Sequence, residues 1–549
     1  MSKSRGKVEV SEELTEEVVS KPNKPVVWLQ ENKNLLIKVF IITTILGLLG
    51  NAFAYFNLDL NSDYLAEYRF DYLHKIQCGR FLQPVVRYIL SGIIVTPWLE
   101  GCWFIFFTGC TVFLVCKTFN YEKILSILII AGLFTNNLWV LFITARCLHD
   151  LATYALALLL AVSVFSYYVK NKENLKFYKI IIIFIMMICS QALYQAFFAV
   201  TITLILIDAI VCLLHGNNFG KELKKLFTVF FVLGIAALFY YLISWVITLM
   251  FDTTLSGNFY SPMASLQSPL QILLRIPVAY SDFLNGLFIS TTILPKSIYY
   301  GPSLLINILN WVLLVLAVLI IVKFIIERKL SIENILLILI LFLILPYAAS
   351  CIYILSGVRR ILYCSYILYY VFILEMFKFS NVKKLVIDLN KFVKVITWGI
   401  LLIIFSNMQL ANTFYTKNSL DKEAALLVMT KVVDKIEAMP NYVGGSTEVV
   451  FFGELNKNQY WYDTLIYLKN GSKIDVFKSI EFNIWDYKSY TEYVMKINMN
   501  CYTYPSYDKN CSVTRVNEQV ETIRTMPIFP TDGYVKEIDG IIVVKLSEF

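Results

Sequence analysis

Four acidic side chains recur at intervals of four residues just beyond the first long apolar segment: Asp59, Asp63, Glu67 and Asp71. A carboxylate here could accept a proton from a hydroxyl group. It could also belong to the solvated face of an interfacial helix. Because carboxylates avoid hydrocarbon unless they are paired or face water, the series predicts where an aqueous site meets a bilayer.

The neighbours of these acids separate them into two kinds. Asp71 has Lys75 four residues on, a spacing that favours a pair on a helix surface. Glu67 is assigned to solvent. Asp59 and Asp63 have no cation within four residues, so they are the candidates for a functional carboxylate. Asp63 ranks first, because small polar neighbours and an aromatic residue surround it in Asn-Ser-Asp-Tyr.

Arginines gather on the side of the predicted membrane domain that is otherwise poor in cations. The planar guanidinium binds two phosphate oxygens at once, so these residues are candidates for a phosphate site. Each could equally anchor a lipid headgroup. The candidates are Arg80, Arg146, Arg275, Arg359 and Arg360.

Polar and aromatic residues near the same membrane edge are candidate contacts for an acceptor or a sugar. Tyr64 follows Asp63, and Tyr194 and Gln195 interrupt a long apolar stretch. His149 and Asp150 begin a span beside an arginine. They could orient an acceptor, but a local helix cap is the favoured interpretation.

Composition places the chain in the membrane. Of 549 residues, 58% are hydrophobic and 16% are charged, and the mean hydropathy is +0.64. The net charge of +8 falls in short lysine clusters between apolar runs, a pattern that orients a membrane protein and does not predict nucleic-acid binding. The sequence contains no phosphate-binding loop and no serine-hydrolase or zinc-protease motif.

Apolar stretches predict about eleven transmembrane helices. The fifth predicted helix is short. The segment from Ser190 to Gln195, which divides it from the sixth, predicts either a tight polar turn or a broken helix that lines a cavity. The approximate spans are 36–58, 101–118, 122–143, 149–169, 178–191, 195–214, 226–251, 303–325, 332–355, 361–378 and 393–411.

The lysine clusters predict a cytoplasmic tail at 1–35, a membrane domain at 36–411 and outer loops at 59–100 and 252–301. Within these loops, Phe81 to Val95 and Pro269 to Phe288 resemble amphipathic interfacial helices. Residues 412–549 are more polar and carry β-branched runs, so we expect a small α/β or α+β domain outside the cytoplasm. The fold class is therefore an α-helical polytopic membrane protein.

Two cysteines in the C-terminal region, Cys501 and Cys511, could form a disulfide there or remain thiols. The remaining cysteines lie mostly in apolar runs and have no metal-binding spacing. No cofactor is expected, although the sequence leaves open a divalent ion on the outer acids.

Several of these motifs resemble the Gtr-type glucosyl transferase II family of bacterial serotype conversion. The resemblance lies in the Asn-Ser-Asp-Tyr segment after the first span and in Gly79-Arg80-Phe81-Leu82, which leads into an apolar outer helix. Ser190 to Gln195 and the arginines before a late span are also similar. The resemblance covers roughly residues 30 to 411.

The resemblance implies a GT-C-like membrane glycosyltransferase in a bacterial inner membrane. Such enzymes transfer glucose from undecaprenyl-phosphate glucose to O-antigen on the periplasmic face. The family usually has Asp-Asp in the first outer loop, whereas this chain has Ser62-Asp63, which leaves open whether Asp63 acts alone or with Asp59. By resemblance, Asp63 is the base, Arg80 a site residue, and Arg359 and Arg360 phosphate partners.

Two other functions would share this topology. A lipid-linked sugar flippase would be expected to carry charges at mid-span and an internal repeat, and neither is evident. An O-antigen polymerase or ligase would share the outer cations.

Overall fold

Most of the residues that the structure describes are in α-helices. The computed structural model describes residues 24–57, 72–92, 96–255, 269–288, 302–357, 363–379, 389–459, 461, 484, 487–504 and 519–548. Within these ranges, nine helices are long and apolar enough to span a membrane. In chain order the principal helices are α1 (Lys24–Phe56), α3 (Tyr72–Gln77), α4 (Gln83–Ser91), α5 (Pro97–Thr118), α6 (Ile124–Thr135), α7 (Leu138–Arg146), α8 (Leu151–Asn171), α9 (Phe177–Leu193), α10 (Phe197–Leu214), α11 (Phe219–Met250), α12 (Pro269–Phe288), α13 (Pro302–Arg328), α14 (Ile332–Ala349), α15 (Cys351–Ser356), α16 (Tyr363–Tyr366), α17 (Leu368–Lys378) and α18 (Leu389–Glu437).

Two of the eleven predicted spans correspond to helices that are too short by themselves. Helix α9 has 17 residues and α17 has 11. At about 1.5 Å per residue, these helices extend roughly 25 Å and 16 Å, and neither is among the nine described helices that are long and apolar enough to span a membrane. Nine spans are therefore supported among the described residues, with α6 and α7 together counted as one, and the exact number stays a prediction.

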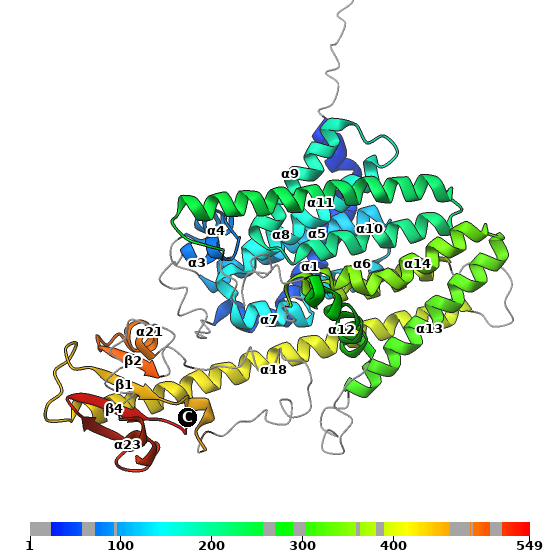
Figure 1. The fold of residues 1–549 in the computed structure, drawn as a ribbon. Coiled ribbons are helices and arrows are strands. Elements are labelled where there is room, and N and C mark those ends of the chain that lie inside the picture. The colour runs from blue at the N-terminus through cyan, green and yellow to red at the C-terminus, as the bar shows by residue number, and fades with distance from the viewer. Residues whose placement is uncertain are drawn as a thin grey trace, which may run out of the picture.

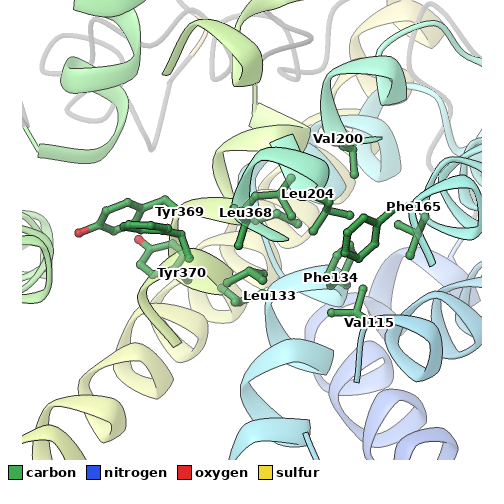
Figure 2. Close-up of a cluster of buried hydrophobic side chains, with 14 of the residues drawn as sticks. Val115, Leu133, Phe134, Phe165, Val200, Leu204, Leu368, Tyr369 and Tyr370 are labelled. Atoms are coloured by element: carbon green, nitrogen blue, oxygen red, sulfur yellow. The ribbon is translucent and has the colours of Figure 1, made fainter. Parts of the chain in front are cut away.

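The centre of the bundle is an apolar core between α5, α6, α8, α10 and α17. Figure 2 shows the side chains that meet there, among them Phe134, Phe165 and Leu204. Phe165 and Leu204 are fully buried. Helices α1, α11 and α13 instead leave most of their apolar windows uncovered, as expected of helices that face lipid.

A break between α6 and α7 interrupts what the sequence presents as one span. The Asn137 side chain accepts hydrogen bonds from the backbone N–H groups of Trp139 and Val140 and so caps α7. Asn136 donates to the carbonyl of Leu46 in α1 at 3.0 Å. Helix α7 then ends at Arg146, and a short turn leads into α8.

Lysine-rich segments from separate loops meet at one end of the bundle. Lys172 pairs with Asp208 at 2.5 Å, and Lys225 pairs with Glu173 and Glu222 at 2.5 and 2.8 Å. The C-terminal ends of α8 and α10 thus lie beside the N-terminal end of α11. We call this the basic end, and the N-terminal ends of α5 and α8 lie at the opposite end.

A four-stranded sheet follows the bundle. Its order is β2 (Cys501–Tyr504), β1 (Val449–Phe452), β4 (Ile541–Lys545) and β3 (Val535–Ile538), with β1 parallel to both of its neighbours and β3 antiparallel to β4. One face packs against the C-terminal half of α18, through Met429 and Val432 among others, and the other packs against α23 (Val520–Thr525).

Helix α18 connects the bundle to this sheet without interruption (Figure 1). The sequence suggests a boundary at residue 412, because charged residues become frequent there, yet the 49-residue helix runs through it. No glycine or proline interrupts the segment between Leu401 and Glu437, so the change in composition does not end the helix.

Candidate functional site

A tight turn between α3 and α4 holds the predicted Gly-Arg pair. Gly79 has a φ of +74°, and its carbonyl accepts a hydrogen bond from the Tyr240 hydroxyl in α11 at 2.9 Å. The Gln195 side-chain amide donates to the Cys78 carbonyl and to the Tyr240 oxygen, both at 2.7 Å. Two distant parts of the chain, α11 and the segment at Gln195, therefore fix the backbone that carries Arg80.

Gly79→Ala is expected to destabilise the protein more than Gly92→Ala does. Both glycines have a φ of +74°, a backbone conformation that strains alanine whatever the space around it. A Cβ at Gly79 would lie 2.5 Å from the Tyr240 hydroxyl, whereas Gly92 has open space. We expect an additional loss of about 1–3 kcal/mol at Gly79. Unfolding in detergent measures the difference, and equal losses would contradict it.

Arg80 is held among aromatic rings. Its Nη1 donates to the Tyr154 hydroxyl at 3.0 Å, and its guanidinium lies 4.9 Å from the Tyr194 ring centroid. Desolvation disfavours the charge, but the surrounding groups, Tyr154 foremost, raise the pKa of Arg80 above its ordinary value. Its Nε is buried and has no hydrogen-bond partner in the described part of the chain. A fixed cation with an unused donor can bind an anion.

The pKa of a thiol beside Arg80 responds to the positive charges around this turn. Cys78 Sγ lies 3.8 Å from His74 Nε2, one helical turn earlier. Burial by itself would raise the pKa of the Cys78 thiol, but the His74 contact and the charges of Arg80 and Lys75 lower it below its ordinary value. The turn is therefore an electropositive environment.

Asp150 lies at the centre of the cluster and is fully buried. Its Oδ2 lies 2.6 Å from Lys75 Nζ and 3.2 Å from His149 Nε2, and it accepts a hydrogen bond from the Tyr154 hydroxyl at 3.3 Å. A buried carboxylate requires such partners. Tyr154 thus contacts both Asp150 and Arg80, and these three residues form one network with Lys75.

These contacts correct two expectations from the sequence. Lys75 is 6% exposed and binds Asp150, so it is not the solvated helix-surface lysine that the sequence predicts. Asp71, its predicted partner, lies outside the described ranges. Asp150 occupies the N-cap position of α8, but its side chain makes no capping hydrogen bond. The local-cap interpretation of Asp150 is therefore wrong, because its carboxylate is used for the ion pair.

Helix α4 turns its polar side toward this network. Gln83, Arg87 and Ser91 are buried, whereas Tyr88 and Ile89 on the other side are 58% and 73% exposed. Gln83 Nε2 donates to Thr153 Oγ1 at 3.3 Å. The predicted amphipathic helix is present, and it buries its polar face in protein while it exposes its apolar face.

Glu100 in the first turn of α5 is a second buried carboxylate at this end. It accepts a hydrogen bond from the Ser91 hydroxyl of α4 and one from the backbone N–H of Ala152 in α8, the latter at 2.8 Å. It is 1% exposed. Glu100 in α5 therefore forms hydrogen bonds with both α4 and α8.

Two other predicted arginines contact a different part of the bundle. Arg275 Nη1 donates to the carbonyls of Ile354 and Leu355 at 3.4 Å each, at the C-terminal end of α15. Such contacts are favourable because helix C-termini attract cations. Arg146, 8% exposed, ends α7, which packs against α16. In the sequence, α15 precedes and α16 follows the segment that contains Arg359 and Arg360.

The structure brings together five of the predicted site residues: Arg80, His149, Asp150, Tyr194 and Gln195. Tyr194, Gln195 and Ala196 separate α9 from α10, so the predicted interruption is confirmed, and its side chains are buried. Six predicted residues lie outside the described ranges: Asp59, Asp63, Tyr64, Arg359, Arg360 and Cys511.

Cys501 lies in β2, with its Sγ 3.4 Å from Thr491 Oγ1. Because Cys511 is outside the described ranges, the disulfide stays a prediction. The described residues contain no cluster of histidine, cysteine and acidic side chains that could hold a metal ion.

Sequence reasoning missed Lys75, Glu100, Tyr154 and Tyr240. Glu100 did carry a signal, since it is a single acid at the start of an apolar run. Tyr154 and Tyr240 carried none, because tyrosine is common throughout this chain.

The family model for the glucosyl transferase GtrII matches residues 52–376, more than half of the chain. The matched region contains the whole Lys75, Arg80, Asp150 and Tyr154 network and ends before the sheet. No curated protein matches the chain. The protein is a member of the glucosyl transferase GtrII family and hence a membrane glucosyltransferase.

Proposed function

We propose that the protein transfers a glucosyl group from a polyprenyl-phosphate-linked sugar, undecaprenyl-phosphate glucose in bacteria, to O-antigen or a related surface polysaccharide. The observation that carries the proposal is the placement of Arg80. It lies in the turn that follows the acid-bearing segment, at the end of the bundle where α4 exposes an apolar face. A lipid donor needs an apolar surface for its chain and a cation for its phosphate.

The reaction requires one proton acceptor and one cationic site. Asp63, helped by Asp59, accepts the proton of the acceptor hydroxyl, and the hydroxyl oxygen forms the new bond to sugar C1. The bond from C1 to the phosphate oxygen breaks, and its electron pair leaves with polyprenyl phosphate. Arg80 stabilises that leaving phosphate. The scheme applies to an inverting transfer; a retaining one would add a step.

The proposed orientation places the basic end in the cytoplasm. The opposite end, where Arg80 and Asp150 lie, is then outside, in the periplasm of a bacterial inner membrane. Lysine-rich loops favour the cytoplasmic side. The basic end contains several lysines, Lys172 and Lys225 among them, and these support a cytoplasmic position for this end of the bundle. Helix α18 then carries the C-terminal sheet to the outer side.

The donor is tested with membranes that contain the full chain and radiolabelled polyprenyl-phosphate glucose. We expect label to enter the polysaccharide, whereas nucleotide-linked glucose, supplied to membranes that lack a polyprenyl-phosphate glucose synthase, gives none. Transfer from the nucleotide sugar alone would overturn the proposal. Movement of labelled lipid across the bilayer without transfer would instead favour a flippase.

Charge reversal of both Arg359 and Arg360 to glutamate is expected to raise the donor KM about 10- to 100-fold, because each arginine would bind phosphate through charged hydrogen bonds. Charge reversal of Lys221 and Lys224 at the basic end is the control, and we expect no change in KM. An unchanged donor KM in the arginine variant would exclude these residues from the phosphate site.

A further inference from the structure

One backbone N–H group in the first turn of α8 has an unusual acceptor. In most helices the N-cap side chain accepts the N–H of the second or third helical residue. Asp150 stands at the N-cap of α8, with φ −115° and ψ 4°, and its side chain makes no such bond. The N–H of Ala152, the second residue of α8, instead donates to Glu100 Oε2 at 2.8 Å. Glu100 therefore caps α8 from a different helix.

Capping by Glu100 leaves the Asp150 carboxylate available for other partners. Asp150 Oδ2 contacts Lys75 Nζ at 2.6 Å and accepts from the Tyr154 hydroxyl at 3.3 Å. The same hydroxyl accepts from Arg80 Nη1 at 3.0 Å. Asp150 thus holds one cation directly and a second one through Tyr154.

Glu100 is itself fixed by its surroundings. The Ser91 hydroxyl at the end of α4 donates to its other oxygen, Oε1. The side chain is 1% exposed, so it has little freedom to move away from α8. A carboxylate at a helix N-terminus is also favoured by the helix dipole.

We propose that Glu100 and Asp150 are positioning residues for the cationic site: Glu100 caps α8 in place of Asp150, and this arrangement directs Asp150 toward Lys75 and, through Tyr154, holds Arg80 against the donor phosphate. The proposal rests on the proposed function in assigning the donor phosphate to Arg80. Neither carboxylate needs to touch the substrate.

The proposal predicts that Glu100 and Asp150 affect donor binding through the same series of contacts, which ends at Arg80. In Glu100→Ala, the N–H of Ala152 loses its acceptor, and Asp150 already occupies the N-cap position from which a side chain caps a helix. If Asp150 turns back to do so, its contacts with Lys75 and Tyr154 are lost. Glu100→Ala should then have the same effect as Asp150→Asn on donor binding.

The test measures donor KM and kcat for the full chain in membranes, with radiolabelled polyprenyl-phosphate glucose as the probe. We expect Glu100→Ala and Asp150→Asn each to raise the donor KM about 10- to 100-fold. The double variant should be no worse than the more affected single variant, since residues on one path are not additive. Tyr154→Phe, a change that removes one hydroxyl, should raise KM in the same direction.

Glu222→Ala is the matched control. Glu222 also lies in the first turn of a helix, is 3% exposed and pairs with a lysine, but it is at the basic end. We expect it to leave the donor KM unchanged, whatever its effect on stability. The double-mutant cycle is repeated on the free energy of unfolding, which does not depend on activity.

Separate outcomes identify which idea fails. A wild-type chain that transfers no label from this donor would overturn the proposed function and, with it, the role of Arg80. A wild-type chain that transfers label overturns the positioning proposal alone in three cases: the double variant multiplies the two KM effects, Glu100→Ala leaves KM unchanged, or Glu222→Ala raises it equally.

Discussion

Replacement of Asp63 with asparagine is expected to reduce glucosyl transfer by about 10²- to 10⁴-fold, the usual contribution of a general base. Asparagine has nearly the same shape as aspartate but cannot accept the proton of the acceptor hydroxyl. The variant should still insert into the membrane, because the change removes a charged group near the membrane surface and adds none. Transfer from labelled polyprenyl-phosphate glucose by purified protein measures the loss.

Asp59→Asn is the matched comparison, since both acids belong to the same outer segment. We expect it to reduce transfer less than Asp63→Asn does, because the Asn-Ser-Asp-Tyr setting favours Asp63 as the base. Full activity of Asp63→Asn would remove Asp63 from the mechanism. A larger loss at Asp59 would reverse the two assignments.

Hydropathy predicted the helices better than their interruptions. The sequence places a single span at 122–143, but Asn136 and Asn137 divide it into α6 and α7. Asparagine side chains satisfy backbone groups that a broken helix exposes, so two adjacent asparagines can end one helix and begin the next. An average over many apolar residues does not detect such a local event. The end of the short α9 was detectable because three polar residues, Ser190, Gln191 and Gln195, follow its apolar run.

The candidate site could be predicted in its position but not in its contacts. Positive charge and acids at the edges of apolar runs pointed to Arg80 and Asp150 separately. The partner of Asp150 could not be found, because Lys75 lies 75 residues away and has a nearer acid in the sequence. The role of Glu100 was equally hidden, since a cap supplied by another helix leaves no pattern in the local sequence. Tertiary packing decides both.

Lys75→Met is expected to cost about 3–5 kcal/mol of stability, because it leaves the buried charge of Asp150 without its closest cation. Lys75 and Asp150 are 6% and 0% exposed, and their charged atoms are 2.6 Å apart. A surface pair would cost only about 0–1 kcal/mol. The magnitude therefore distinguishes a buried role for Lys75 from a solvated pair with Asp71. Equilibrium unfolding in mixed detergent micelles measures it.

Two further variants make this test specific. Lys435→Met removes a lysine from an exposed pair, in which the Lys435 and Asp532 side chains are 46% and 91% exposed, so its cost should stay below about 1 kcal/mol. The double variant Lys75→Met with Asp150→Asn removes both charges of this ion pair and should recover most of the lost stability, because the side chain at position 150 is then neutral and no longer needs the lysine. If Lys75→Met alone costs no more than Lys435→Met, Asp150 does not depend on Lys75, and the network loses its central ion pair.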